Sequence, residues 1–171
     1  GDFEVRRVTE FEGPFIAPEV FFPDFDPEVV RANPDMAGPR LIDPATGKLV
    51  FTFHSFIVKT GHHTILIDSC LGNDKERPTR PQFHRLRTPF LADLASAGVR
   101  VEDVDYVMCT HLHWDHVGWN TRLENGRWVR NRPPTRRTFE VTLGEVLRCT
   151  RDGITVNTFM MSREPYLMDF V

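Results

Sequence analysis

Three histidines and one aspartate within six residues are the side chains of this sequence best suited to chemistry. They are His111, His113, Asp115 and His116. Imidazole and carboxylate groups are ligands of zinc and similar divalent ions, so the first two can converge on one ion and the last two on a second. Two ions about 3.5–4 Å apart polarise a carbonyl or phosphoryl oxygen and activate water, which predicts metal-assisted hydrolysis without a nucleophilic serine or cysteine. The alternative, a chance cluster of solvated histidines, is disfavoured because the cluster directly follows an apolar strand.

Apolar patterns and turn residues predict the elements that position this cluster. Thr88 as the cap, Pro89 at the first helical position and Gly98 at the stop predict a helix. Asn125-Gly126 predicts a hairpin turn. The predicted strands cover residues 3–11, 49–59, 63–68 and 101–110, the last of them buried and ending at the cluster. Strands that surround a helix in this order are typical of an α/β domain.

Residues 13–44 have a different composition, with seven prolines and four phenylalanines. Because proline lacks an N–H donor and has a fixed φ, this segment excludes a long helix or a central strand. Its aromatic side chains still need burial. We therefore expect an ordered, extended arm that packs on the domain or over a pocket.

Composition is that of a soluble globular domain, and it excludes several classes of function. The chain has 171 residues, of which 40% are hydrophobic and 26% are charged, with a net charge of −3. This charge disfavours nucleic-acid and membrane-surface partners, and no apolar run approaches the ~20 residues of a membrane span. The start of the chain shows no signal-peptide pattern, and the three cysteines show no CxxC spacing. We expect a cytoplasmic protein with a small-molecule substrate, and a homodimer stays open.

The cluster and its surroundings resemble the signature of the metallo-β-lactamase-fold hydrolases. The pattern HxHxDH is present as THLHWDHVGWN, which follows EDVDYVMCTH. Upstream, ILIDSCLG resembles the family's strand that ends in aspartate before a small residue and a glycine. The resemblance covers residues 45–128. It implies an αββα sandwich with a dinuclear metal site at one edge of the sheets.

The resemblance also implies a role for each residue of the pattern. His111 and His113 would bind the first zinc ion, and Asp115 and His116 the second. Asp115 would also orient the bridging hydroxide that attacks the substrate and pass a proton to the leaving group. Asp68 would support the ligand loop, and its alternative role is that of a turn former at a strand end. Since diiron oxidoreductases of the superfamily usually carry glutamate at the second position, His113 favours hydrolysis over redox chemistry.

A lactone or another small ester is the substrate class that we favour. Trp114 and Trp119 flank the ligands and are candidates for an apolar pocket wall, although packing alone would also explain them. His84 lies in a loop where family members often build the pocket wall, and it is a candidate substrate contact. A β-lactam, a glutathione thioester, a phosphotriester and an alkyl sulfate stay open, because one fold hosts many substrates.

Three further ligands of the family pattern are not found downstream of the cluster. They are a histidine for the first ion, an aspartate shared by both ions and a histidine for the second, yet no histidine follows His116. Residues 130–171 carry seven arginines and no lysine. We therefore expect one partial domain over residues 1–171 with an atypical tail from residue 130, caused by truncation or a reading-frame change, or else a short divergent member. A non-catalytic remnant with weak or no metal binding is the competing function.

Overall fold

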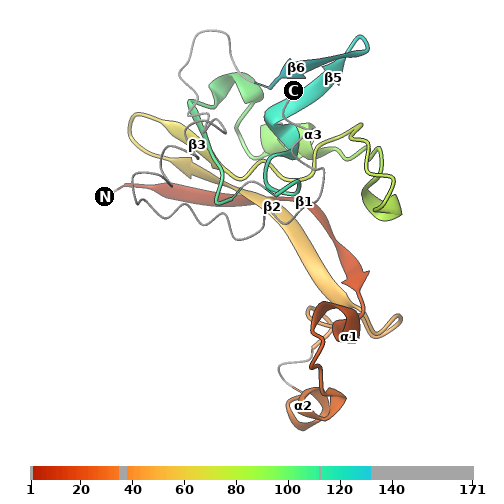
Figure 1. Cartoon of the computed structure of the whole chain (residues 1–171). Helices are drawn as coiled ribbons and strands as arrows, with labels where there is room; N and C mark the ends of the chain where they lie inside the picture. Colours follow the sequence, from red (N-terminus) through yellow and green to blue (C-terminus); the bar gives the residue numbers. More distant parts are fainter. Residues whose placement is uncertain (1, 35–37, 112, 132–171) are drawn as a thin grey trace, which may run out of the picture. The chain divides into compact units, whose positions relative to one another are not determined.

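The computed structural model describes residues 2–34, 38–111 and 113–131. These residues form two compact units, one made of residues 11–53 and the other of the described residues before and after them. Strands β1 (Glu4–Ile16) and β2 (Leu49–Lys59) contribute residues to both units (Figure 1). No helix in these ranges is long and apolar enough to cross a membrane. The arginine-rich tail lies outside the described residues from position 132 onward.

A four-stranded mixed sheet positions the histidine cluster. Its order is β1-β2-β3-β4, where β3 is Thr64–Ile67 and β4 is Tyr106–Met108. Strands β2 and β3 are antiparallel, whereas β3 and β4 are parallel and are connected through helix α3 (Phe90–Ser96). Because parallel strands end at the same edge of a sheet, the residues that follow β3 and β4 meet there.

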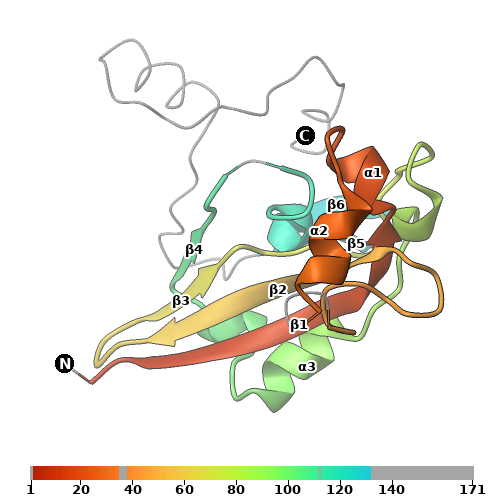
Figure 2. The same cartoon turned by 90° about the horizontal axis from the view of Figure 1, so that it is seen from below.

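The core of this unit lies between the sheet and α3 (Figure 2). The strand register aligns Ile57, Leu66 and Val107 across β2, β3 and β4. Phe90 and Leu94 of α3 belong to the same hydrophobic cluster. Since side chains alternate between the two faces of a strand, one aligned row is enough to attach the helix to the sheet. The predicted α/β class is confirmed.

Three predicted elements differ from the structure in detail, the first being β1, which runs past the expected end at residue 11 to Ile16. Strand β4 has only three residues, because the first part of the expected strand forms the 3₁₀ turn η2 (Val101–Asp103), and Met108 is 44% exposed rather than buried. Thr88 does not cap α3, whose N-cap residue is Pro89. The Thr88 hydroxyl instead donates to Glu10 Oε1 at 2.8 Å, because a buried carboxylate is a stronger acceptor and needs donors of its own.

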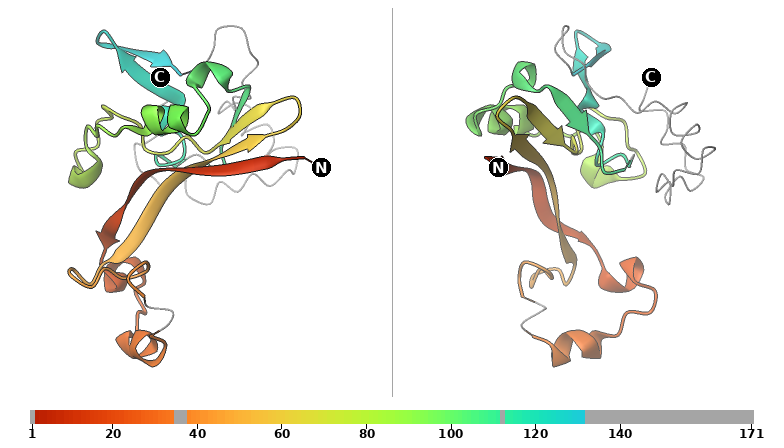
Figure 3. Two further views of the ribbon diagram at one scale, coloured as in Figure 1. Left: turned by 180° about the vertical axis from the view of Figure 1, so that it is seen from behind. Right: turned by 90° about the vertical axis from the view of Figure 1, so that its left-hand side faces the viewer.

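Strands β5 (Thr121–Glu124) and β6 (Arg127–Arg130) form a separate two-stranded hairpin (Figure 3). Asn125 and Gly126 connect them with φ values of 50° and 76°. Positive φ at both central residues is the geometry that an Asn-Gly turn favours, so the predicted hairpin is confirmed. The Lys75 ammonium lies 4.0 Å from the centre of the Trp128 ring and ties the hairpin to the loop after β3.

The proline-rich arm contains two short helices, α1 (Pro18–Phe21) and α2 (Pro27–Ala32). Proline begins each of them, as expected for a residue whose missing N–H costs nothing at the first helical position. Within this unit, the rings of Phe15 and Phe21 pack on Phe51 with centroids 4.8 and 5.3 Å away. The described part of the arm contains no long helix, as predicted. Its packing on the domain or over a pocket stays a prediction.

Candidate metal centre

Backbone hydrogen bonds join the two loops that leave the same edge of the sheet. One loop follows β3, and the other contains the histidine cluster after β4. Ser69 N donates to His116 O at 2.7 Å, Gly118 N to Cys70 O at 2.8 Å, and Trp119 N to Ser69 O at 2.9 Å. These three bonds fix the end of the cluster to the loop after β3.

The two loops touch because neither has a side chain at the point of contact. A Cβ on Gly118, the first residue of the 3₁₀ turn η3 (Gly118–Asn120), would lie 1.9 Å from Leu71 O. A Cβ on Gly72 would lie 2.4 Å from Gly118 O. Gly72 also has a φ of +75°, a conformation that other residues rarely adopt. The close approach of the loops therefore depends on both glycines.

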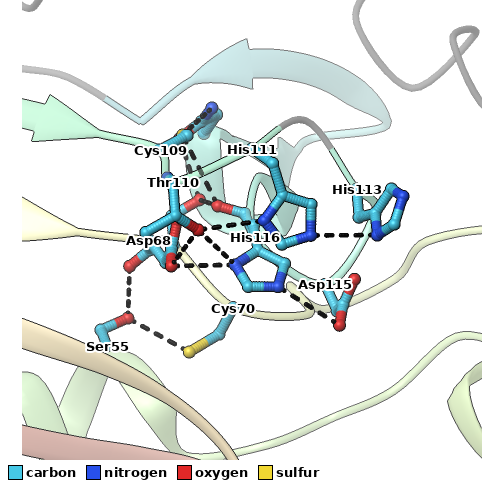
Figure 4. A network of polar contacts seen from close by, with 11 residues as sticks. Ser55, Asp68, Cys70, Cys109, Thr110, His111, His113, Asp115 and His116 are labelled. Atoms are coloured by element: carbon cyan, nitrogen blue, oxygen red, sulfur yellow. Dashed lines mark hydrogen bonds and ion pairs between the residues drawn. The ribbon is translucent and has the colours of Figure 1, made fainter. Parts of the chain in front are cut away.

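The first two histidines face each other through their ring nitrogens (Figure 4). His111 Nε2 and His113 Nδ1 are 3.0 Å apart. Two nitrogens bound to one tetrahedral zinc ion at 2.0–2.1 Å would be about 3.4 Å apart, so the pair has nearly the spacing of two ligands of one ion. Burial and the neighbouring imidazoles lower the pKa of His111. This shift favours the neutral ring, which is the form that binds metals.

Asp115 and His116 form a second pair beside the first. Asp115 Oδ2 lies 3.6 Å from His116 Nε2, and the rings of His111 and His116 have centroids 3.8 Å apart. The other nitrogen of His116, Nδ1, lies 2.9 Å from Asp68 Oδ2 (Figure 4). This contact favours a proton on Nδ1, so Nε2, on the side of Asp115, is the nitrogen at which an ion could bind in place of a proton.

Asp68 connects the cluster to the end of β3. Its carboxylate accepts hydrogen bonds from Thr110 N at 2.7 Å and from Thr110 Oγ1 at 2.9 Å, in addition to the contact with His116. Burial works against the charge, but the hydrogen bonds from His116 and Thr110 outweigh it and hold the pKa of Asp68 below its ordinary value. For His116, burial lowers the pKa less than Asp68 and Asp115 raise it, so its pKa is raised. Asp68 thus contacts both Thr110 and His116, and its expected role as the support of a metal-ligand loop stays a prediction.

The donor set matches zinc in kind and in pairwise spacing but is short in number. In residues 2–34, 38–111 and 113–131, no group of three or more histidine, cysteine, aspartate or glutamate side chains is arranged to hold one ion. Each pair supplies two donors, whereas a protein zinc site takes at least three ligands from the protein. A complete site therefore requires at least one further donor for each ion.

Trp119 lies in the core, with only 6% of its surface exposed. Its ring stacks on Phe90 at 5.8 Å, and its Nε1 donates to Glu10 Oε1 at 2.8 Å. The structure therefore favours the packing role that the sequence left open. Glu10 also accepts from Leu71 N and Thr88 Oγ1, and its burial raises its pKa. No local signal marks Glu10, because its partners are distant in the sequence.

Trp114 packs on the loop between β3 and α3, and His84 is part of this loop. The half-buried Trp114 packs its ring on Phe83, the last residue of the 3₁₀ turn η1 (Pro81–Phe83), with centroids 5.2 Å apart. His84 Nδ1 accepts from Arg77 N at 2.9 Å, and its Nε2 lies 3.6 Å from Glu76. Their proposed contact with substrate stays a prediction. Arg77, a further residue that sequence reasoning missed, is almost completely buried beside Trp114.

The two cysteines near the cluster are not activated thiols. The Cys70 sulfur lies 3.1 Å from Ser55 Oγ, and burial strongly raises the pKa of Cys70. Burial also raises the pKa of Cys109 to about 11. Both thiols stay protonated at neutral pH, so neither is a nucleophile or a metal ligand in this state.

A family model described as the metallo-beta-lactamase superfamily matches residues 53–152, which is more than half of the chain. The matched range extends beyond residue 128, which is the last residue of the resemblance found in the sequence. No curated protein matches the chain.

Three solved structures similar to this chain share its fold. A probable metal-dependent hydrolase from Staphylococcus aureus has a TM-score of 0.54 and 20% identity, covering 71% of this chain and 42% of its own. The dizinc quorum-quenching lactonase AidC has a TM-score of 0.51 and 23% identity, with coverages of 69% and 36%. The hydrolase AbOPH of the beta lactamase superfamily has a TM-score of 0.57 and 24% identity, with coverages of 81% and 41%. The chain thus spans about two fifths of the length of these proteins. The family match, the fold and the HxHxDH cluster together show that the chain belongs to the metallo-β-lactamase superfamily.

Proposed function

We propose that this chain contributes part of a zinc-dependent hydrolase site that cleaves an ester-like bond, with a lactone or a small ester as the favoured substrate. The observation that carries the proposal is the arrangement of four donors as two adjacent pairs, His111 with His113 and Asp115 with His116. Adjacent pairs suit two ions that share a substrate, whereas separate solvated histidines would have no reason to converge.

Four residues of the chain would bind the two ions, and two others orient one of these ligands. His111 and His113 would hold the first ion, and Asp115 and His116 the second. Asp68 fixes the orientation of the His116 ring through Nδ1, so that Nε2 is the nitrogen left for the metal. Thr110 in turn holds the Asp68 carboxylate through its amide and its hydroxyl. The site is therefore partly ordered by its own hydrogen bonds.

Zinc at this site would polarise the carbonyl oxygen of the substrate and make water acidic enough to attack at neutral pH. The chain then needs a group that accepts and returns a proton. Asp115 is the candidate, because its carboxylate lies at the side of His116 Nε2 and within the cluster. In this role it would orient the attacking water and pass a proton to the leaving alcohol.

A lactone is the first substrate to test. The similar structure AidC is a dizinc lactonase solved with an N-acyl homoserine product, which shows that a related fold hosts this reaction. A lactone also needs no charged binding group, in keeping with the modest net charge of −3.

The experiment combines metal analysis with turnover by the 171-residue chain. We expect at least one zinc ion per chain, with turnover of a chromogenic lactone or ester that is lost with a chelator and restored by zinc. The substitution His113→Ala should abolish binding of the first zinc ion and, with it, turnover. His62→Ala is the matched control, because His62 lies exposed at the turn between β2 and β3. A zinc content near zero and no turnover would contradict the proposal and support the non-catalytic alternative.

A further inference from the structure

Arg77 is a buried cation in the loop between β3 and α3, and the metal centre described above does not use it. Its side chain is 2% exposed. Its Nη2 donates to Leu71 O at 2.6 Å and to Trp114 O at 3.3 Å, and its Nη1 donates to Phe83 O at 3.5 Å. A guanidinium presents its N–H groups in a rigid planar fork, which the single ammonium of lysine cannot reproduce. Arg77 thereby joins three separate pieces of backbone.

One of these pieces lies inside the ligand cluster. Trp114 separates His113 from Asp115, two residues that would serve different ions. Arg77 holds the carbonyl of the peptide between Trp114 and Asp115, and its guanidinium carbon lies 4.9 Å from the centre of the Trp114 ring. Arg80 lies over the same ring at 5.0 Å, but Arg77 also binds the Trp114 carbonyl. Arg77 therefore restrains the backbone of Trp114 as well as its ring, and with the backbone the directions in which the neighbouring ligands leave it.

A second piece lies at the other end of the cluster. The Leu71 carbonyl, which accepts the shorter of the two Nη2 bonds, is the atom nearest to the position of a Cβ on Gly118. Arg77 thus supports the contact between the two loops at the same time as it holds Trp114. Arg77 thus contacts Trp114 within the turn that carries Asp115 and His116, and it binds the Leu71 carbonyl that lies against Gly118 at the end of this turn.

We propose that Arg77 is a positioning residue that orders the ligand turn from His113 to Gly118 before a metal ion binds. The ordering of the turn by Arg77 follows from these contacts, whereas any consequence for zinc affinity rests on the proposed function. A buried charge is costly, and an apolar side chain of similar volume often replaces one with little loss of stability. Unlike an apolar side chain, the guanidinium of Arg77 binds three carbonyl groups. What Arg77 adds beyond stability is therefore the order of the turn.

The test compares Arg77→Lys and Arg77→Met with the matched control Arg85→Lys, which lies in the same loop but is exposed and paired with Glu76. The first measurement is amide hydrogen exchange in the metal-free chain, read at His116 and Gly118, whose amides are hydrogen-bonded, and in α3. We expect exchange at least about tenfold faster in the turn and unchanged in α3 for both Arg77 variants. The second measurement is titration with zinc alone, for which we expect an affinity reduced about 10–100-fold.

Several outcomes would overturn the inference. Exchange in the turn that matches the wild-type chain in both variants would show that Arg77 does not order it. An equal rise in the turn and in α3 would show a general packing role instead. If one variant fails to fold, the other decides, because Lys keeps the charge and Met keeps the apolar volume. If the wild-type chain binds no zinc, the proposed function fails, and the exchange measurement alone still decides the role of Arg77.

Discussion

Replacing Gly118 with alanine tests whether contact between the two loops holds the histidine cluster in place. The new Cβ would lie 1.9 Å from Leu71 O, whereas real Cβ contacts essentially never fall below 3.0 Å, so the loops would have to separate by about 1.1 Å. The bond from Gly118 N to Cys70 O, now 2.8 Å, would lengthen to about 3.9 Å and be lost. Two neighbouring backbone bonds join the same loops. At about 1 kcal/mol for each bond, the expected loss in the free energy of unfolding is about 3 kcal/mol.

Urea unfolding followed by tryptophan fluorescence measures this loss. Gly61→Ala is the control, because no heavy atom lies within 4 Å of the position of its Cβ. That control should stay within about 0.5 kcal/mol of the wild-type chain. If Gly118→Ala were as stable as Gly61→Ala, the loops would not need their close contact, and our account of the cluster's support would be refuted.

Three further predictions concern the buried carboxylates. Glu10→Gln replaces a carboxylate acceptor with an amide whose NH₂ group would face the buried donors. We therefore expect the free energy of unfolding, measured with urea, to fall by about 1–3 kcal/mol. The control Glu19→Gln, at an exposed position, should leave it unchanged. Because the pKa of Asp68 is lower in the folded chain than its ordinary value of 3.8, the ionised carboxylate stabilises the fold at pH values above 3.8. This contribution disappears as the pH falls through the pKa of the folded chain. The difference in the free energy of unfolding between the wild-type chain and Asp68→Asn should therefore shrink on acidification to that range. A constant difference would contradict this assignment. Asp68→Asn should also weaken zinc binding about 10–100-fold in calorimetric titration, because it removes the acceptor of His116 Nδ1, whereas the exposed Asp24→Asn should not.

Local patterns predicted most elements because their signals lie in neighbouring residues. The Asn125-Gly126 turn is an example, since positive φ at both positions is a preference of those two residue types. The extent of β4 could not be predicted in this way. Its partner β3 is only four residues long, so three residues of β4 find backbone partners there, and the residues before them form a 3₁₀ turn. Strand length is thus set by pairing as well as by apolar composition.

The same distinction applies to Trp119 and Thr88. Their positions in the sequence suggested a pocket wall and a helix cap, yet both side chains bind the carboxylate of Glu10. Glu10 comes from β1, far from either residue in the sequence. A hydrogen bond between distant segments leaves no periodic or spacing signal, so reasoning from one sequence cannot find it.

Residue types and their order are enough to predict which side chains could bind a metal ion, because ligand chemistry depends on residue type and the four candidate donors lie in one short run. The family resemblance added the expected support from Asp68. The contacts that hold this run in place become visible in the folded chain: the contact between Gly118 and the loop after β3, the burial of Glu10 and the three carbonyl contacts of Arg77. Burial and hydrogen bonding join segments that are close in space, and the order of residues along the chain does not record that closeness.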